Sequence, residues 1–121
     1  MESGVPQMEQ SNLESNLKKA LTELLLLSLL GRKECYIGEL TQLLEQYSGS
    51  VLRLTFPYSA IYRLEQAGCI RELPKRTAPD GRRRQYFEIT PEGREHLAKQ
   101  SEIFRAFCVG VNAVLEGEAK Q

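Results

Sequence analysis

The chain has 121 residues and 41% hydrophobic content, which supports one compact domain with a single core. Sixteen basic and sixteen acidic residues give a formal net charge of zero, so the total charge does not indicate a nucleic-acid partner. The apolar runs are shorter than the roughly 20 residues that span a bilayer, and three scattered cysteines with one histidine lack the spacing of a metal site.

The N-terminal segment is polar, and residues 1–12 lack the basic start and apolar run of a signal peptide. We therefore expect a disordered tail there and a cytoplasmic protein, with no membrane contact, no metal and no cofactor. The first helix is expected to begin near Ser15 or Asn16, either of which can cap it, and to end at Leu30 before Gly31.

Leucines cover more than one stripe of this first helix, and they include Leu17, Leu21 and Leu24. A helix that is buried on several sides needs more apolar partners than a small monomer provides, which indicates a dimer. A central helix in the core of a monomer explains the same pattern equally well.

A second helix is expected from Tyr36 to Tyr47, after the polar turn RKEC, with apolar side chains spaced to face the core. The following segment, SVLRLTF, alternates apolar and polar residues and predicts a brief strand or an extended connection. It leads into a third helix from Phe56 to Gly68, with Pro57 near its start and Gly68 at its end.

The third predicted helix has two contrasting faces at 100° per residue. Its apolar half consists of Pro57, Ala60, Ile61, Leu64 and Ala67. The opposite half carries no carboxylate and consists of Ser59, Tyr62, Arg63 and Gln66. These four side chains offer hydrogen-bond donors that suit phosphate oxygens or base edges. A solvated face of an ordinary amphipathic helix is the alternative for this pattern taken alone.

Two strands, Cys69 to Lys75 and Arg84 to Ile89, are expected to form a β-hairpin around a turn with the sequence Pro-Asp-Gly. The hairpin tip is basic, because residues 75–84 hold five basic side chains and one acidic one, whereas the first seventy residues hold six basic and eight acidic ones. Such side chains would bind phosphates and make binding sensitive to salt. The basic residues of the tip are Lys75, Arg76, Arg82, Arg83 and Arg84.

A last helix is predicted from Pro91 to about Glu116, with Thr90 as its cap and Glu92 in its first turn. Apolar side chains recur every seven residues along it, which is typical of a helix that packs against another helix. Because an exposed apolar stripe is rare on a soluble monomer, we expect it to pair two copies of the chain. The expected dimerisation residues are Leu17, Leu21, Leu24, Leu97, Phe104, Phe107, Val111, Val114 and Leu115.

The order of these elements is helix, helix, short extended segment, helix and basic hairpin, which is the order of a winged helix-turn-helix. The predicted fold is therefore mainly α with a small β-hairpin (α+β). It comprises a disordered tail at 1–12, a DNA-binding domain at 13–90 and a C-terminal dimerisation helix at 91–117. In this fold the third helix enters the major groove of DNA, and the hairpin lies along the backbone or the minor groove.

Three stretches of the chain resemble the PadR family of bacterial winged-helix transcriptional regulators. They are IGEL at Ile37–Leu40, FPYSAIYRLEQAG at Phe56–Gly68 and GRRRQYFEITPEG at Gly81–Gly93. The corresponding family patterns are G-Y-E-L, T-L-Y-P-x-L-x-R-L-E-x-x-G and G-R-R-R-x-Y-Y-x-L-T-x-x-G. The resemblance implies double-stranded DNA as a partner and a homodimer of the short subfamily, in which a single C-terminal helix crosses the partner chain.

The departures from the family pattern concern the operator sequence and the ligand. The family's T-L-Y-P becomes Phe56-Pro57-Tyr58-Ser59, so the resemblance carries over only Tyr58 from these four positions as a DNA contact. Gly38 stands where the family usually has the tyrosine of G-Y-E-L. Some family members bind flat aromatic drugs between tryptophans at the dimer centre, and this chain has no Trp, so that mode of binding does not transfer.

The residues and the resemblance together predict a dimeric repressor that binds an inverted-repeat operator, with a small-molecule effector left open. The expected DNA contacts are Tyr58, Ser59, Tyr62, Arg63, Gln66, Lys75, Arg76, Arg82, Arg83 and Arg84. A winged helix that serves as a protein-interaction or assembly module is the alternative, because the net charge is zero and the third helix starts differently. We do not expect an enzyme, because the chain has one histidine, no Ser/His/acid spacing and no glycine loop for phosphates.

Overall fold

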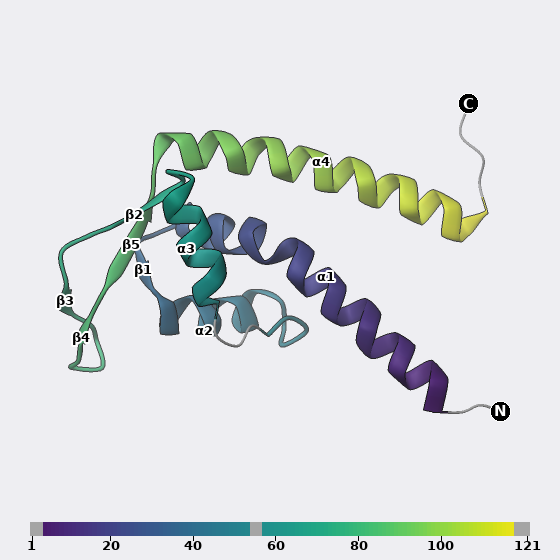
Figure 1. Ribbon diagram of the computed structural model, residues 1–121, viewed down its shortest axis with the longest axis horizontal. Helices are drawn as coiled ribbons and strands as arrows, with labels where there is room; N and C mark the ends of the chain where they lie inside the picture. Colours follow the sequence, from purple (N-terminus) through teal and green to yellow (C-terminus); the bar gives the residue numbers. More distant parts are fainter. Residues whose placement is uncertain (1–3, 54–56, 118–121) are drawn as a thin grey trace.

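The computed structural model describes residues 4–53 and 57–117. Its helices are α1 (Gly4–Leu30), α2 (Ile37–Tyr47), α3 (Tyr58–Gln66) and α4 (Pro91–Glu116). Its strands are β1 (Cys35–Tyr36), β2 (Ile70–Glu72), β3 (Arg76–Thr77), β4 (Arg83–Arg84) and β5 (Tyr86–Ile89). In Figure 1, α2, α3 and the strands gather around the C-terminal half of α1, whereas α4 runs away from the sheet as a long rod. This mainly helical α+β architecture confirms the predicted fold class.

The core lies where the last turns of α1 meet α2, α3 and the sheet. Leu26 and Leu27 are fully enclosed there, so the C-terminal part of α1 is the central helix of the domain. Burying each large apolar side chain contributes about 1.5–3 kcal/mol before ordering costs, so this cluster holds α3 firmly against α1. Its largest members are Leu26, Leu27, Leu29, Leu30, Leu40, Leu44, Ile61, Leu64, Ile70, Phe87 and Ile89.

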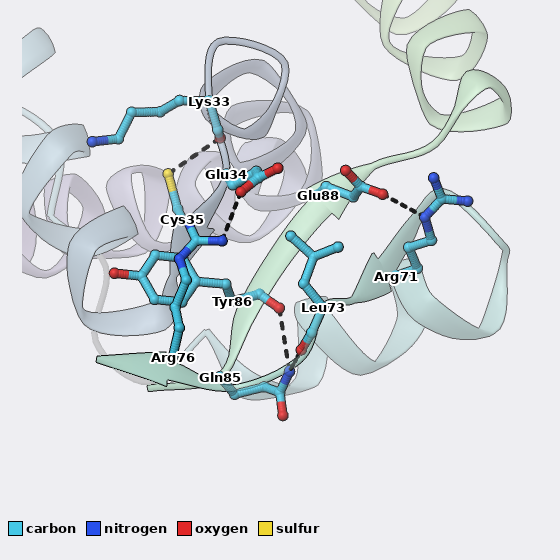
Figure 2. Close-up of polar contacts among 9 residues, drawn as sticks. All are labelled: Lys33, Glu34, Cys35, Arg71, Leu73, Arg76, Gln85, Tyr86 and Glu88. Carbon is cyan, nitrogen blue, oxygen red and sulfur yellow. Dashed lines mark hydrogen bonds and ion pairs between the residues drawn. The ribbon is translucent and has the colours of Figure 1, made fainter. Parts of the chain in front are cut away.

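A three-stranded antiparallel sheet in the order β1-β5-β2 covers one end of this core. Tyr36 of β1 lies opposite Tyr86 of β5, and Arg71 of β2 lies opposite Glu88 of β5. The Nε atom of Arg71 lies 2.6 Å from the Oε2 atom of Glu88, and Figure 2 shows this cross-strand ion pair. The sheet therefore places β5, the strand that leads into α4, at its centre.

The predicted hairpin exists, but a break divides each of its strands into two. Strand β2 pairs with β5, and β3 pairs with β4 in a separate two-stranded ribbon. We call this ribbon and the turn between its strands, residues 76–84, the wing. Pro74 precedes the ribbon and cannot donate to a ladder, which limits β2. On the returning strand, the side-chain amide of Gln85 donates to the carbonyl oxygens of Leu73 and Tyr86 (Figure 2), so a side chain replaces a ladder bond.

Helix α1 begins at Gly4, so the expected start at Ser15 or Asn16 is wrong, and residues 4–12 are helical instead of disordered. Serine and asparagine inside a helix cost only about 0.5 kcal/mol each relative to alanine, which a long helix tolerates. Pro6 falls in the first turn, where a backbone N–H has no acceptor within the helix. A cap residue in the sequence therefore did not mark the start.

Two short segments also differ from the expectation. The polar turn RKEC contains the start of strand β1, which pairs with β5 and is too short to show an alternating pattern. Residues 50–53 form a turn followed by irregular backbone, so no strand is present in the described part of SVLRLTF. Residues 54–56, which include the expected helix start at Phe56, lie outside the described part of the chain.

The joint between the sheet and α4 matches the prediction closely. Thr90 caps α4, because its Oγ1 atom accepts a hydrogen bond of 3.0 Å from the backbone N–H of Gly93 and donates one of 2.6 Å to the carbonyl of Gly68. Pro91 occupies the first helical position, and a left-handed Gly117 (φ 75°) ends the helix. Thr90 therefore ties the start of α4 to the end of α3. No helix in residues 4–53 and 57–117 is long and apolar enough to cross a membrane.

Candidate nucleic-acid interface

Helix α3 buries one face and exposes the other, as its sequence predicts. Ala60, Ile61 and Leu64 are buried in the core. The predicted outer face is exposed along its length, and its four residues are Ser59, Tyr62, Arg63 and Gln66. Ala67 was expected on the inner face but is exposed, because α3 ends at Gln66 and Ala67 is its C-terminal cap.

Two tyrosines dominate the exposed face of α3. Tyr58 lies in its first turn and Tyr62 one turn later, and their side chains are 60% and 62% exposed. A phenol is large, amphipathic and able to donate a hydrogen bond, so an exposed pair of this kind suits a groove or a sugar-phosphate surface. The outer face of α3 therefore offers two phenols, a hydroxyl and an amide without a carboxylate among them.

Arg63 is placed differently from the other residues of this face. Its Nε atom lies 2.5 Å from the Oε2 atom of Glu23 on α1, so the guanidinium is held beside α1 at the surface. Both side chains are partly exposed, and an ion pair in such a position is worth about 0–1 kcal/mol. An anion that binds Arg63 at Nε would therefore compete with Glu23.

Asp80 organises the tip of the wing. Its Oδ1 atom accepts a hydrogen bond of 3.0 Å from the backbone N–H of Arg82, and its Oδ2 atom lies 2.6 Å from Nη2 of Arg84. The Arg84 guanidinium, followed by the backbone N–H of Arg82, lowers the pKa of the Asp80 carboxyl below its ordinary value. Gly81 supplies the positive φ of 86° that the turn requires. The only acidic residue of the tip thus stabilises the turn in which it lies.

Arg76 and Arg84 lie against tyrosine rings. The guanidinium of Arg76 lies 3.7 Å from the centroid of the Tyr86 ring, and its Nη1 atom lies 2.8 Å from Oε1 of Glu34 (Figure 2). The guanidinium of Arg84 lies 5.0 Å from the centroid of the Tyr36 ring. Sequence reasoning did not find Glu34, Tyr36 or Tyr86, because nothing in the spacing of the chain relates Glu34 to an arginine 42 positions later.

The remaining cations of the wing region face solvent. Lys75, Arg82 and Arg83 are exposed, and within the described ranges their side chains form no ion pair with a carboxylate. Arg83 donates only a long hydrogen bond of 3.4 Å to the carbonyl of Lys75. The five predicted phosphate contacts therefore divide into two that the chain itself neutralises and three that it does not.

The apolar stripe of α4 is uncovered over most of its length. Phe107 is 71% exposed, and Val114 and Leu115 are each 78% exposed. The exposed large side chains of the predicted stripe are Ile103, Phe104, Phe107, Val111, Val114 and Leu115. On α1, Leu17 is exposed, whereas Leu21 and Leu24 are half-buried. Leu97 packs against the core of its own chain and holds the start of α4 there.

No group of three or more histidine, cysteine or acidic side chains in the described part of the chain is placed to hold a metal ion. Burial raises the pKa of the Cys35 thiol to about 12, so this thiol stays protonated near pH 7 and is a poor nucleophile.

Comparison with known proteins gives consistent results. The model of the transcriptional regulator PadR-like family matches residues 26–99. A PadR family transcriptional regulator from Eggerthella lenta has a TM-score of 0.78 and 22% identity, covering 94% of this chain and 98% of that one. A PadR-like transcriptional regulator from Bacillus cereus has a TM-score of 0.72 and 23% identity, covering 85% and 99%. A Streptococcus transcriptional regulator has a TM-score of 0.69 and 28% identity, covering 81% and 95%. No curated protein matches the chain.

Proposed function

The chain belongs to the PadR-like family of transcriptional regulators, and from this premise we propose that it is a cytoplasmic dimeric repressor that binds an inverted-repeat DNA operator. Regulation of transcription through DNA follows from the family. The repressor action, the two-fold operator and the residues that contact it are the proposal. The proposal includes no cofactor, and it leaves a response to a small-molecule effector open.

The observation that carries the proposal is the outer face of α3. Ser59, Tyr62 and Gln66 are exposed on a helix whose other side is locked in the core, and no carboxylate interrupts them. In a winged helix-turn-helix, a helix in this position contacts base edges in the major groove, while phosphate contacts fix its register. Tyr58, in the first turn of α3, is proposed to meet the DNA backbone.

The apolar stripe of α4 supports the proposal that two copies of the chain form a dimer. Six large apolar side chains of the stripe are exposed in the single chain, and an uncovered patch of this kind is rare on soluble monomers. The first half of α1 offers Leu17 as an exposed counterpart. A two-fold arrangement through these helices would set two copies of α3 toward successive major grooves, about 34–36 Å apart, which requires an inverted repeat.

A protein-interaction module is the second candidate, and one observation favours it. Arg63, Arg76 and Arg84 are each paired with a carboxylate of the chain, which reduces the positive charge that DNA would meet. Retention on heparin at low salt separates the two candidates. A DNA-binding protein should be retained through the positive charges of Lys75, Arg82 and Arg83, whereas a protein-interaction module should not be retained.

The decisive experiment is fluorescence anisotropy with duplexes from the region just upstream of the protein's own gene. We expect one duplex to bind at least a hundredfold more tightly than a scrambled duplex of equal length, in line with specific protein–DNA binding. A reporter driven by the same region should lose expression when the protein is present. Equal affinity for all duplexes, or no binding to any of them, would contradict the proposed operator binding.

A further inference from the structure

We infer that Arg76 and Arg84 are positioning residues, which hold the wing on the body of the domain through Tyr86 and Tyr36. Their contacts belong to the free protein and do not depend on DNA. The corollary, that phosphate contact falls to Lys75, Arg82 and Arg83, rests on the proposed function.

The four side chains come from two cross-strand pairs. Arg76 and Arg84 lie opposite each other in the β3–β4 ribbon, and Tyr86 and Tyr36 lie opposite each other in the β5–β1 ladder. The guanidinium of Arg76 covers the Tyr86 ring at 3.7 Å, and that of Arg84 covers the Tyr36 ring at 5.0 Å. An arginine pair of the wing therefore docks on a tyrosine pair of the sheet.

The two tyrosine rings also contact each other. Their centroids are 5.4 Å apart and their planes meet at 73°, an edge-to-face arrangement that aromatic pairs prefer. Tyr86 is buried and Tyr36 is half-buried, so the rings are anchored in the domain. The two arginines of the wing thus contact rings that are packed in the body of the domain.

The placement of two arginines opposite each other requires compensation, since like charges on facing strands repel. A carboxylate supplies it at each position: Glu34 lies 2.8 Å from Arg76, and Asp80 lies 2.6 Å from Arg84. Glu34 directly precedes β1, so the Arg76 ion pair joins the wing to the sheet, as Figure 2 shows. Both charges are therefore satisfied without a phosphate.

Of the two arginines, Arg84 is held more strongly by its contacts within the protein. Its side chain is only 33% exposed, and it contacts both Asp80 and the Tyr36 ring. A turn of this guanidinium toward a phosphate would break both the contact with Tyr36 and the ion pair with Asp80. In contrast, Arg82 and Arg83 are exposed in the same strand and turn and can meet a phosphate without leaving a protein partner of this kind.

Lysine substitutions separate charge from stacking, because lysine keeps the charge of arginine but lacks the planar guanidinium that stacks on a ring. Arg76→Lys and Arg84→Lys are compared with Arg82→Lys and Arg83→Lys in the free protein. The readout is amide hydrogen exchange at Ala78, whose N–H donates to the Arg82 carbonyl across the wing at 2.8 Å. We expect exchange about tenfold faster in the first two variants, as weakened cation–π contacts predict, and no change in the controls. Equal exchange in all four variants would overturn the inference.

A second arm changes no charge at all. Tyr36→Leu removes the ring under Arg84, whereas Tyr36→Phe keeps it, so we expect the leucine variant to reproduce the faster exchange of Arg84→Lys and the phenylalanine variant to resemble the wild type. Wild-type exchange in Tyr36→Leu would show that the ring does not hold the wing and would overturn the inference.

The third arm measures affinity for a 20-base-pair duplex of random sequence. If Arg76 and Arg84 position the wing, their lysine variants should bind about threefold to tenfold more weakly, although the charge is unchanged. Arg105→Lys, at an exposed position of α4 outside the proposed interface, should bind as the wild type does. Wild-type affinity in Arg76→Lys and Arg84→Lys would assign these residues to phosphate contact and overturn the corollary. Failure of the wild type to bind any duplex would contradict the proposed function, whereas the exchange measurements would still decide the positioning role.

Discussion

The guanidinium of Arg63 on α3 is held by Glu23 on α1, with 2.5 Å between the Nε and Oε2 atoms. This ion pair joins the helix proposed to read DNA to the central helix of the core. Because both partners are partly exposed, the pair is worth about 0–1 kcal/mol, less than a good bidentate contact with a base. A base contact in the correct operator could therefore displace Glu23 from Arg63. A random duplex, which lacks this contact, would gain less free energy from displacing Glu23.

Glu23→Gln should strengthen binding to random duplexes by about threefold to tenfold, because Arg63 is released and a negative charge near the interface is removed. The operator should gain less, so specificity falls. Anisotropy titrations with both duplexes measure this. Glu102→Gln, an equal change of charge at an exposed position of α4, is the control. Equal gains in Glu23→Gln and Glu102→Gln would mean that total charge, and not the pair, is responsible.

Arg63→Ala should weaken operator binding by about 1–3 kcal/mol and random-duplex binding by less, as expected for a base contact. The same two duplexes provide the measurement. If both affinities fall equally, Arg63 contacts only phosphate. If neither affinity changes, its pairing with Glu23 is its sole role.

Arg82→Ala combined with Arg83→Ala should flatten the dependence of log K on log salt by up to about 1.8, since each lost phosphate contact removes about 0.9. Anisotropy between 50 mM and 200 mM salt measures the slope. Arg105→Ala is the control, because it removes a cation from an exposed position of α4. An unchanged slope in the double variant would remove these two arginines from the interface.

Phe104→Asp combined with Phe107→Asp should give monomers or aggregates without specific DNA binding, because charges would enter the apolar stripe of α4. Val109→Asp is the matched control: Val109 is also exposed, but it lies on the opposite side of the helix. Sedimentation velocity at micromolar concentration reports the assembly state. A wild-type protein that sediments as a well-behaved monomer would refute the proposed dimer.

Gly93→Ala should destabilise the domain by about 1–3 kcal/mol, the usual cost of overpacking. A Cβ atom at position 93 would lie 2.0 Å from the carbonyl oxygen of Cys69, so the start of α4 would have to move. Gly110→Ala in the same helix meets no atom within 4 Å and should not destabilise the chain. Urea unfolding compares the two, and an equal midpoint for both variants would show that the joint tolerates displacement.

Local chemistry explains which parts of the fold the sequence predicts. Thr90, Pro91 and Glu92 mark the start of α4 because capping depends on adjacent residues. The buried face of α3 is predictable because helical spacing places Ala60, Ile61 and Leu64 together. The start of α1 is not, since serine and asparagine are tolerated inside a long helix as well as at its end.

The candidate site is predictable in its composition but not in its contacts. The sequence identifies the basic tip and the outer face of α3 from charge and spacing alone. It cannot tell that Arg63 meets Glu23 or that Arg76 meets Glu34, because these partners are 40 and 42 positions apart and only the fold brings them together. Tertiary contacts thus separate side chains that look equivalent in the sequence.

The hydrogen bonds of Thr90 to Gly68 and Gly93 make α4 a lever arm with its pivot at the end of α3. A helix of 26 residues is about 39 Å long, so a tilt of about 5° at the pivot moves its far end by about 3 Å. In the proposed dimer, repacking of the far ends of α4 against the partner would therefore change the spacing of the two α3 helices. A ligand or partner that binds at these far ends could therefore change the spacing of the two α3 helices so that it no longer fits the operator, without altering any residue that touches DNA.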